Sequence, residues 1–215
     1  ATPLGAPREG SIGTPSDYLE LAIADEEDHP LPPRQEGELV ARPRTPFTTM
    51  LEYHRKPRET VAAWRNLWFH TGDLAREDED GYVYFVGRRA HRIRRRGENI
   101  SAFEVEGVIN THEKVLESAV VGVTSELGDE DVKAYVRLRS EAAMEPEELI
   151  RWCEARLALF KIPRYVEFVE EIPRTEATQR IDRQKLKRLG LGNAWDRQRP
   201  GETSRQGSER GERAQ

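Results

Sequence analysis

The sequence lacks most of the features that would commit it to a membrane, a disulfide framework or a metal cluster. Cys153 is its only cysteine, which excludes an intrachain disulfide and a zinc site built from several cysteines. No apolar run approaches the roughly 20 residues of a membrane-spanning helix, and no basic-then-apolar leader opens the chain. Hydrophobic residues make up only 36% and charged residues 34%. We therefore expect a cytoplasmic protein with a modest core and no membrane partner.

The charge balance also argues against one class of partner. The formal net charge is −5, whereas a general nucleic-acid binder carries a basic face. The arginine-rich run over residues 88–96 is the one local exception. We expect no nucleic-acid partner. The chain begins at Ala1, within a segment rich in proline and glycine, and we expect it to be the downstream part of something longer.

Residues 1–87 are predicted to form a small, strand-rich unit. The opening is rich in glycine and proline, which is typical of a loop. Period-two alternation of apolar residues predicts half-buried strands, and the Asp80-Gly81 dipeptide predicts a turn. The expected elements are a loop over 1–16, strands over 18–24, 37–41 and 81–87, a helix over 59–67 and a turn over 78–81.

Residues 88–191 are predicted to form an α+β domain of the usual size. Ser101 followed by Glu104 is a capping box that opens a helix, and Pro146 suits the first turn of another. The expected order is a basic strand over 92–96, a helix over 101–111, strands over 115–123 and 132–138, a helix over 146–160, a strand over 164–172 and a helix over 181–189. Residues 192–215 have almost no apolar side chain, so we expect a disordered tail. The short connection near Arg88 predicts a hinge between the two units.

The sequence has no Ser/His/Asp nucleophile motif, no zinc-ligand spacing and no glycine-rich phosphate loop with a lysine. Polar clusters in both units are the remaining candidates for a functional site. Asp73 follows Gly72, where a carboxylate can accept two hydrogen bonds from a sugar diol or simply cap a turn. Gly87–Arg88 and the run 94–101 can bind phosphate or form a solvated basic strand.

The third cluster is the polar loop over residues 173–183, which places Arg180 just before a helix. Its simpler interpretation is an N-cap loop that carries a surface arginine.

The order and spacing of these clusters resemble the downstream part of the adenylate-forming acyl-CoA synthetase (AMP-binding enzyme) superfamily. The resemblance covers nearly all of residues 11–190, and the group it most resembles is that of the crotonobetaine/carnitine-CoA ligases and related medium-chain ligases. Each motif is short, but the series is in register. The motifs are Ser11-Ile12-Gly13, Gly37-Glu38-Leu39, Glu52-Tyr53, Trp68 to Asp73, Asp80-Gly81-Tyr82, Gly87-Arg88, Arg95 to Ser101, Phe103 to Glu106, Phe160-Lys161-Ile162-Pro163 and Pro173-Arg174-Thr175.

The resemblance implies a two-step reaction of the kind found in fatty-acid metabolism. A small carboxylic acid and ATP, with Mg²⁺, give an acyl-adenylate and pyrophosphate; coenzyme A (CoA) then displaces AMP. In such enzymes a large N-terminal domain holds the substrates and a small C-terminal domain rotates between the steps. Residues 1–87 would be the strand-rich end of the large domain, and residues 88–191 the small mobile domain. The oligomeric state stays open, a homo-oligomer included.

The resemblance also implies roles for single residues. Asp73 would bind the ribose hydroxyls, Arg88 the ribose and the neighbouring phosphate, and Phe85 would lie beside the nucleotide. Arg96 and Gly97 would line the pantetheine path of CoA.

Two positions depart from the family pattern. Arg180 stands where the family has its catalytic lysine, with Gln179 in place of the preceding glycine, and Lys185 is the nearest alternative cation. Ala90 occupies the hinge position, which is usually Asp or Lys. His112 matches a helix-end histidine that contacts metal in some relatives, but a structural role is the simpler one.

The family's phosphate loop and most of its acyl pocket have no counterpart in these 215 residues. We therefore expect the chain alone to be inactive. The alternatives are a non-catalytic fragment or partner protein, and an adenylating enzyme that loads a carrier protein instead of CoA.

Overall fold

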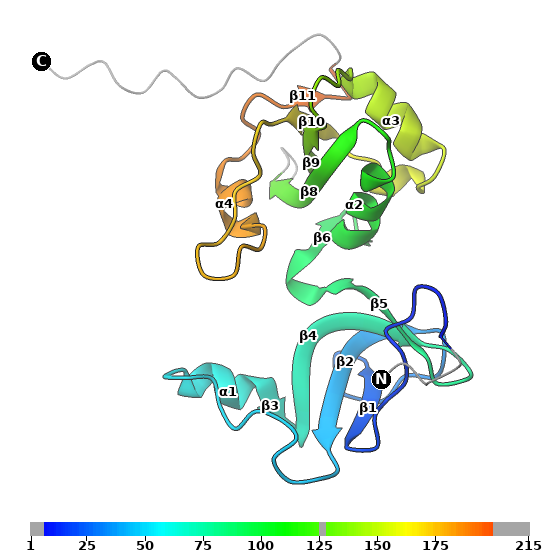
Figure 1. Cartoon of the computed structure of the whole chain (residues 1–215), viewed down its shortest axis with the longest axis vertical. Helices are drawn as coiled ribbons and strands as arrows, with labels where there is room; N and C mark the ends of the chain where they lie inside the picture. The colour runs from blue at the N-terminus through cyan, green and yellow to red at the C-terminus, as the bar shows by residue number, and fades with distance from the viewer. Residues whose placement is uncertain (1–6, 125–127, 200–215) are drawn as a thin grey trace, which may run out of the picture. The chain divides into compact units, whose positions relative to one another are not determined.

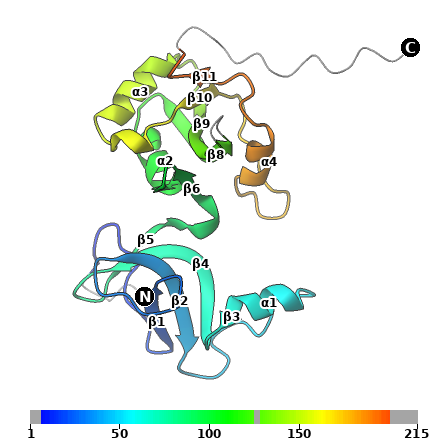
Figure 2. The same cartoon turned by 180° about the vertical axis from the view of Figure 1, so that it is seen from behind.

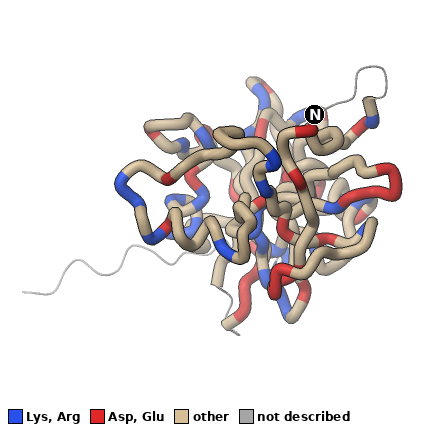
Figure 3. Tube along the Cα trace, turned by 90° about the horizontal axis from the view of Figure 1, so that it is seen from below, with Lys and Arg blue, Asp and Glu red and all other residues tan. Residues whose placement is uncertain are grey.

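The computed structural model describes residues 7–124 and 128–199 of the chain. The chain divides into two compact units, a first unit of Ala1–Ala90 and a second unit of His91–Gln215, and the predicted α+β class is confirmed. Figures 1 and 2 show the two units from opposite sides. Lysine and arginine residues are interspersed with aspartate and glutamate residues along the trace in Figure 3. No helix among the described residues is long and apolar enough to cross a membrane.

The first unit is built on a five-stranded sheet in the order β1-β2-β4-β3, with β5 pairing on β4. All of its strand pairs are antiparallel. Four buried residues, one from each of the strands β1, β2, β4 and β5, form its apolar cluster: Ile23, Leu39, Ala75 and Val83. The elements are β1 (Leu19–Ala24), β2 (Glu36–Pro43), α1 (Pro57–Ala63), β3 (Trp64–Arg65), β4 (Trp68–Glu77) and β5 (Val83–Arg88).

The sequence predicted β1, β2 and β5 but missed β4, which has ten residues. The predicted helix over 59–67 is too long at its end, because α1 stops at Ala63. Asn66 and Leu67 have φ values of +50° and +62°, which a helix cannot contain. They turn the chain from β3 into β4, so that Trp64 lies opposite Phe69. The helical pattern therefore ran across a hairpin.

The second unit has a four-stranded sheet in the order β11-β10-β9-β8 and a separate two-stranded hairpin, β6–β7. Strands β8 and β9 are antiparallel, and β10 runs parallel to β9. The elements, with the short helix η1 that leads in from the first unit, are η1 (Arg89–His91), β6 (Arg92–Arg95), β7 (Glu98–Ser101), α2 (Ala102–Asn110), β8 (Val115–Thr124), β9 (Glu130–Leu138), α3 (Pro146–Glu154), η2 (Leu159–Lys161), β10 (Tyr165–Phe168), α4 (Arg183–Arg188) and β11 (Trp195–Asp196).

Both faces of this sheet are covered. Neighbouring residues of one strand face different apolar clusters, as strand geometry requires. Val120 packs with residues of α2 and α3, whereas Val121 packs with Leu186 of α4. In Figure 1 the helices α2 and α3 accordingly lie on one side of β8 and β9, and α4 lies on the other. This covering explains why β8 is apolar over most of its length rather than strictly alternating.

The helix predicted from the capping box is confirmed, because Ser101 Oγ accepts a hydrogen bond from the Glu104 amide at the start of α2. The helix predicted over 146–160 is correct at its start but too long. It ends at Glu154, and Leu157 closes it with a backbone bond to Cys153. Leu157 still packs against the core, so its apolar character reflects burial rather than helix.

The predicted disordered tail is wrong for residues 192–199. Ala194 is fully buried, and Trp195 and Asp196 form β11, which pairs with β10. The carboxylate of Asp196 receives two hydrogen bonds of 3.1 Å from the guanidinium of Arg164. The polar composition of this segment therefore did not indicate the burial of Ala194, the strand β11 or the ion pair between Asp196 and Arg164. Residues 200–215 lie outside the described residues.

Candidate functional site

Two of the predicted nucleotide-binding side chains meet in the first unit. Asp73 on β4 and Arg88 on β5 are register partners, and Nε of Arg88 lies 3.0 Å from Oδ1 of Asp73. The Arg88 side chain is 48% exposed and that of Asp73 is 27% exposed. A carboxylate and a guanidinium are thus both available to a polar ligand at one place. Phe85, the third predicted residue, pairs with Ala75 farther along the same two strands and is half-buried.

The backbone around Asp73 is held in a defined bend within β4. Gly72 has a φ of +72°, a conformation that residues with a Cβ rarely adopt. Thr71 Oγ1 donates a 2.6 Å hydrogen bond to the carbonyl of Leu39 and accepts one of 3.0 Å from the amide of Asp73. The amide of Gly72 donates to Oε1 of Glu38 at 3.1 Å. Both anchoring partners, Glu38 and Leu39, belong to β2.

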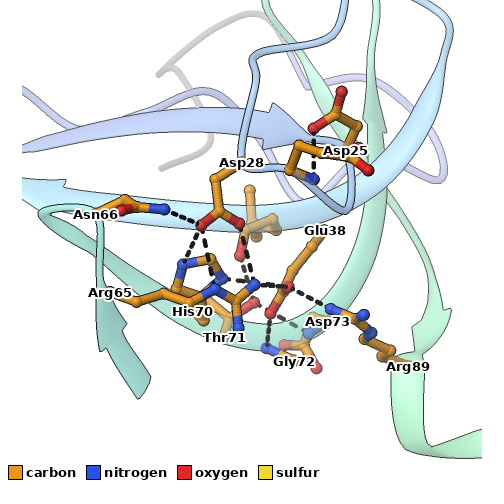
Figure 4. Close-up of polar contacts among 12 residues, drawn as sticks. Asp25, Asp28, Glu38, Arg65, Asn66, His70, Thr71, Gly72, Asp73 and Arg89 are labelled. Carbon is orange, nitrogen blue, oxygen red and sulfur yellow. Dashed lines mark hydrogen bonds and ion pairs between the residues drawn. The ribbon is translucent and has the colours of Figure 1, made fainter. Parts of the chain in front are cut away.

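The carboxylate of Glu38 is the centre of a buried polar cluster, drawn in Figure 4. Its side chain is only 7% exposed. Besides the amide of Gly72, it faces Nδ1 of His70 at 3.2 Å and the guanidinium of Arg89 at 3.1 Å, both through Oε2. The guanidinium of Arg65 lies 3.6 Å away. A buried carboxylate needs such partners, because an unpaired one is very costly.

A second carboxylate, that of Asp28, lies on the other side of His70 (Figure 4). Arg65 donates two hydrogen bonds to it, and Asn66 donates a third of 2.6 Å. His70 Nε2 is 3.7 Å from the same carboxylate. The hydrogen bond from Arg65 is the main cause that lowers the pKa of Asp28 from 3.8 to about 2. Asp28 is therefore ionised under all ordinary conditions.

Glu38, His70 and Arg89 have no role that the sequence alone predicts. Glu38 precedes His70 by 32 positions, so no local spacing links them. The signal that could have found Glu38 is its place directly after Gly37. A Cβ at Gly37 would lie 2.3 Å from the carbonyl oxygen of Ala24. The glycine lets β1 and β2 approach closely there. The backbone of the charged residue that follows, Glu38, is therefore held in a fixed position.

In the second unit, the predicted CoA-contacting residues lie at the tip of the β6–β7 hairpin. Arg96 and Gly97 have φ values of +50° and +85° and are exposed. Their neighbour Arg95 is buried instead, with Nε 2.8 Å from the carboxylate of Asp131 and a hydrogen bond to the carbonyl of Phe160. The basic run therefore serves two purposes: Arg95 fixes the hairpin to the domain, and Arg96 faces solvent.

Arg180 is exposed at the end of a closed loop in the second unit. The amide of Thr175 donates to the Arg180 carbonyl at 2.8 Å, and the amide of Gln179 donates to the Thr175 carbonyl at 2.9 Å. The guanidinium of Arg174 also holds the Gln179 carbonyl. Gln179 has a φ of +53°, which is the conformation that glycine adopts at least cost. Lys185, the alternative cation, is exposed on α4.

His112 is buried beside α2. Its Nδ1 accepts a hydrogen bond from the Lys114 amide, its Nε2 lies 3.6 Å from Glu148, and its ring meets Trp152 edge-on at 4.7 Å. Across residues 7–124 and 128–199, no group of three or more His, Cys, Asp or Glu side chains could hold a metal ion. Ala90 is exposed and is the last residue of the first unit.

Known proteins are similar to this chain in both sequence and fold. A family model for the AMP-binding enzyme C-terminal domain matches residues 104–178. The crotonobetaine/carnitine–CoA ligase of Shigella flexneri is 38% identical over 178 residues, which are 82% of this chain and 34% of that protein.

Two solved structures extend the comparison. The amide bond synthetase McbA from Marinactinospora thermotolerans is 32% identical with a TM-score of 0.75, over 84% of this chain and 36% of its own. ATP-bound MatB from Rhodopseudomonas palustris is 28% identical with a TM-score of 0.78, over 87% of this chain and 37% of its own. The chain thus spans about a third of the length of these relatives.

Proposed function

We propose that this chain is the C-terminal part of an AMP-binding, adenylate-forming ligase. The matches in sequence and structure support this proposal. The parent activity is ATP-dependent ligation of a carboxylic acid to CoA. The acid's carboxylate attacks the α-phosphorus of ATP and pyrophosphate leaves. The CoA thiol then attacks the carbonyl carbon of the acyl-adenylate and AMP leaves. Mg²⁺ is proposed to accompany ATP, and the cytoplasm is proposed as the site of reaction.

The observation that supports this function best is the pairing of Asp73 with Arg88. A carboxylate accepts hydrogen bonds from the two hydroxyls of a ribose, and a guanidinium donates to a phosphate oxygen. Their side-by-side placement on β4 and β5 suits the ribose and α-phosphate of one nucleotide, which are adjacent groups. Phe85, half-buried on β5, is proposed to contact the same nucleotide.

The residues proposed for the second unit act on the reacting groups. Arg180 would neutralise charge that develops between the carboxylate and the α-phosphate during adenylation. Arg96 and Gly97 would line the path of the CoA thiol during the second step. We propose that Ala90 lies at the hinge that lets the second unit rotate between the two steps. For His112 we favour a structural role, because both of its ring nitrogens already face protein groups.

One comparison favours a second candidate for the final step. McbA, which shares this fold, is named an amide bond synthetase, so the fold itself does not decide which nucleophile accepts the acyl group. An amine or the thiol of a carrier protein could replace CoA. The acceptor is therefore tested separately from the adenylation.

The decisive experiment has two arms. In the first, 5′-AMP is titrated into the 215-residue chain while the amide resonances of Gly72, Asp73 and Arg88 are followed by NMR. Saturable shifts at these residues are expected, and shifts that are absent or spread over the chain would favour the non-catalytic alternative.

In the second arm, ATP–pyrophosphate exchange is measured with a panel of carboxylic acids, on this chain and on an upstream-extended form. We expect exchange only in the extended form, and CoA, amines and a carrier protein are then compared as acceptors.

A further inference from the structure

Glu38 differs from the other ion-paired carboxylates of the first unit in what it binds. Its Oε1 accepts a backbone hydrogen bond from Gly72, and its Oε2 lies 3.1 Å from the guanidinium of Arg89. Gly72 directly precedes Asp73, and Arg89 directly follows Arg88. One buried carboxylate therefore holds the chain on both sides of the Asp73–Arg88 pair.

The bond to Gly72 has few substitutes. Gly72 lies in a left-handed conformation at +72°, which is one of several that glycine adopts without strain, so contacts with its surroundings must select it. A hydrogen bond to an ionised acceptor is roughly twice as strong as a neutral one. Two other contacts hold this bend from outside β4: the bond from Thr71 Oγ1 to the Leu39 carbonyl and the pairing of Asp73 with Arg88 on β5. Glu38 is the one carboxylate that binds the backbone of the bend itself, so the direction in which the Asp73 carboxylate points depends in part on Glu38.

The bond to Arg89 acts on the other strand. Arg89 is 47% exposed, so solvent would otherwise compete for its guanidinium. Because Glu38 is 7% exposed, the pair is shielded at the carboxylate end and is worth more than a surface ion pair. It limits the freedom of the chain directly after β5, where Arg88 must face Asp73.

We infer that Glu38 is a positioning residue that preorganises Asp73 and Arg88 for the nucleotide. This inference rests on the proposed function for the identity of the ligand. Its structural half, the control of the Gly72 bend, can be measured without any ligand. Preorganisation raises affinity by removing the cost of ordering these groups on binding.

The test compares Glu38→Ala and Glu38→Gln with a matched control, Glu20→Gln. Glu20 is also an ion-paired carboxylate of this sheet, bound twice by Arg42, but it touches neither Gly72 nor Arg89. Two quantities are measured on the full 215-residue chain: hydrogen exchange of the Gly72 amide without ligand, and the affinity for AMP.

For Glu38→Ala we expect the Gly72 amide to exchange about tenfold faster and AMP to bind about tenfold more weakly, which is about 1.4 kcal/mol. Glutamine keeps an oxygen acceptor for Gly72 but has no charge for Arg89. Glu38→Gln should therefore retain protection of Gly72 and still lose AMP affinity by a few-fold. The control should match the wild type in both quantities.

The outcomes separate the two claims. If Glu38→Ala folds and the Gly72 amide stays protected, or if the amide is released while AMP affinity is unchanged, the inference is wrong. If Glu38→Ala does not fold, unchanged AMP affinity in Glu38→Gln overturns the inference equally. If the wild-type chain itself does not bind AMP, the proposed function fails, and the exchange of Gly72 alone then decides whether Glu38 controls the bend.

Discussion

Arg88 and Asp73 lie opposite each other on β5 and β4, with Nε of the arginine 3.0 Å from Oδ1 of the aspartate. Each side chain therefore neutralises the other before any ligand arrives. The guanidinium has five donors and the carboxylate about four acceptor positions, so this single ion pair leaves both groups able to bind more. Under the proposed function, a ribose and a phosphate would bind at these remaining positions.

The first prediction concerns Asp73→Asn. The amide keeps the size of the side chain but loses the charge that holds Arg88 and strengthens the bonds to ribose hydroxyls. We expect AMP affinity to fall about 10- to 100-fold, the equivalent of a lost hydrogen bond to a charged group at about 1.5–3 kcal/mol. Isothermal titration calorimetry measures this directly. Asp17→Asn, at an exposed position of the same unit, is the control, and equal affinities in both variants would make Asp73 a turn residue only.

The second prediction concerns acid stability and Asp28. The folded-state pKa of this carboxyl lies below its ordinary value of 3.8, at about 2. A lowered pKa stabilises the fold above the unfolded value, and that contribution is lost as pH falls from about 4 through about 2. Asp28→Asn cannot titrate, so its stability should fall less than that of the wild type over this window. Urea unfolding at pH 5, 4, 3 and 2.5 tests this, and parallel losses in the two proteins would contradict it.

The third prediction concerns Cys153. Burial raises the pKa of its thiol to about 11, and the side chain is fully buried on α3. Since the thiolate is the reactive form, iodoacetamide should not modify Cys153 in the folded protein at pH 8. Modification should appear only with unfolding in urea. Rapid modification in buffer, followed by mass spectrometry, would show that this core opens locally.

The fourth prediction concerns the C-terminal strand. Asp196→Ala removes one carboxylate from a buried network in which Arg164 also binds Asp131. Breaking a buried pair costs about 3–5 kcal/mol, and because Arg164 keeps one partner we expect about 3 kcal/mol. Urea unfolding measures the change. Glu171→Ala, an exposed carboxylate of the same unit, should change stability by less than about 0.5 kcal/mol, and an equally small effect at Asp196 would contradict the network's role.

Much of the fold follows from local patterns, but several predicted bounds were wrong. Alternation located β1 and β5, and Ser101 located the start of α2. The predicted end of α3 was wrong because Leu157 is packed against the core by tertiary contacts, and that of α1 was wrong because the chain turns at Asn66 and Leu67. Strand β4 was missed because the polar side chains of His70 and Thr71 bind β2 rather than solvent. Alternation does not indicate a strand whose polar side chains are bound by a neighbouring strand.

The candidate site was predicted only in part, for a related reason. Asp73 and Arg88 stood out because each lies beside a glycine, and the structure brings them together. Glu38 and His70 lie within two of the quoted motifs but were assigned no role, because their contact depends on pairing between β2 and β4. A buried ion pair between distant segments leaves no trace in the spacing of either segment. Arg95 shows the reverse error, since one member of a basic run proved to be buried and structural.

The last prediction concerns Arg180, which the resemblance places at the position of the family's lysine. Its loop is closed by backbone bonds between Thr175 and both Gln179 and Arg180, so the Arg180 main chain is held in place while its side chain stays exposed. Gln179 occupies a left-handed conformation at +53°, so the loop keeps the shape that a glycine would give it. The loop is therefore suited to presenting a cation, although a guanidinium is broader than the ammonium it replaces.

In the upstream-extended form, Arg180→Ala should slow acyl-adenylate formation by about 100- to 1,000-fold. That is the usual effect of removing one electrostatic contact to the transition state, at about 2.7–4 kcal/mol. Thioester formation from pre-made acyl-adenylate should be nearly unchanged, because the attack of the acid on the α-phosphorus, which Arg180 is proposed to assist, is already complete. Single-turnover measurements of each half-reaction give both rates. Lys185→Ala, which removes another exposed cation five positions along, is the control. A loss in both half-reactions, or in neither, or a loss in the control instead, would place the adenylating cation away from Arg180.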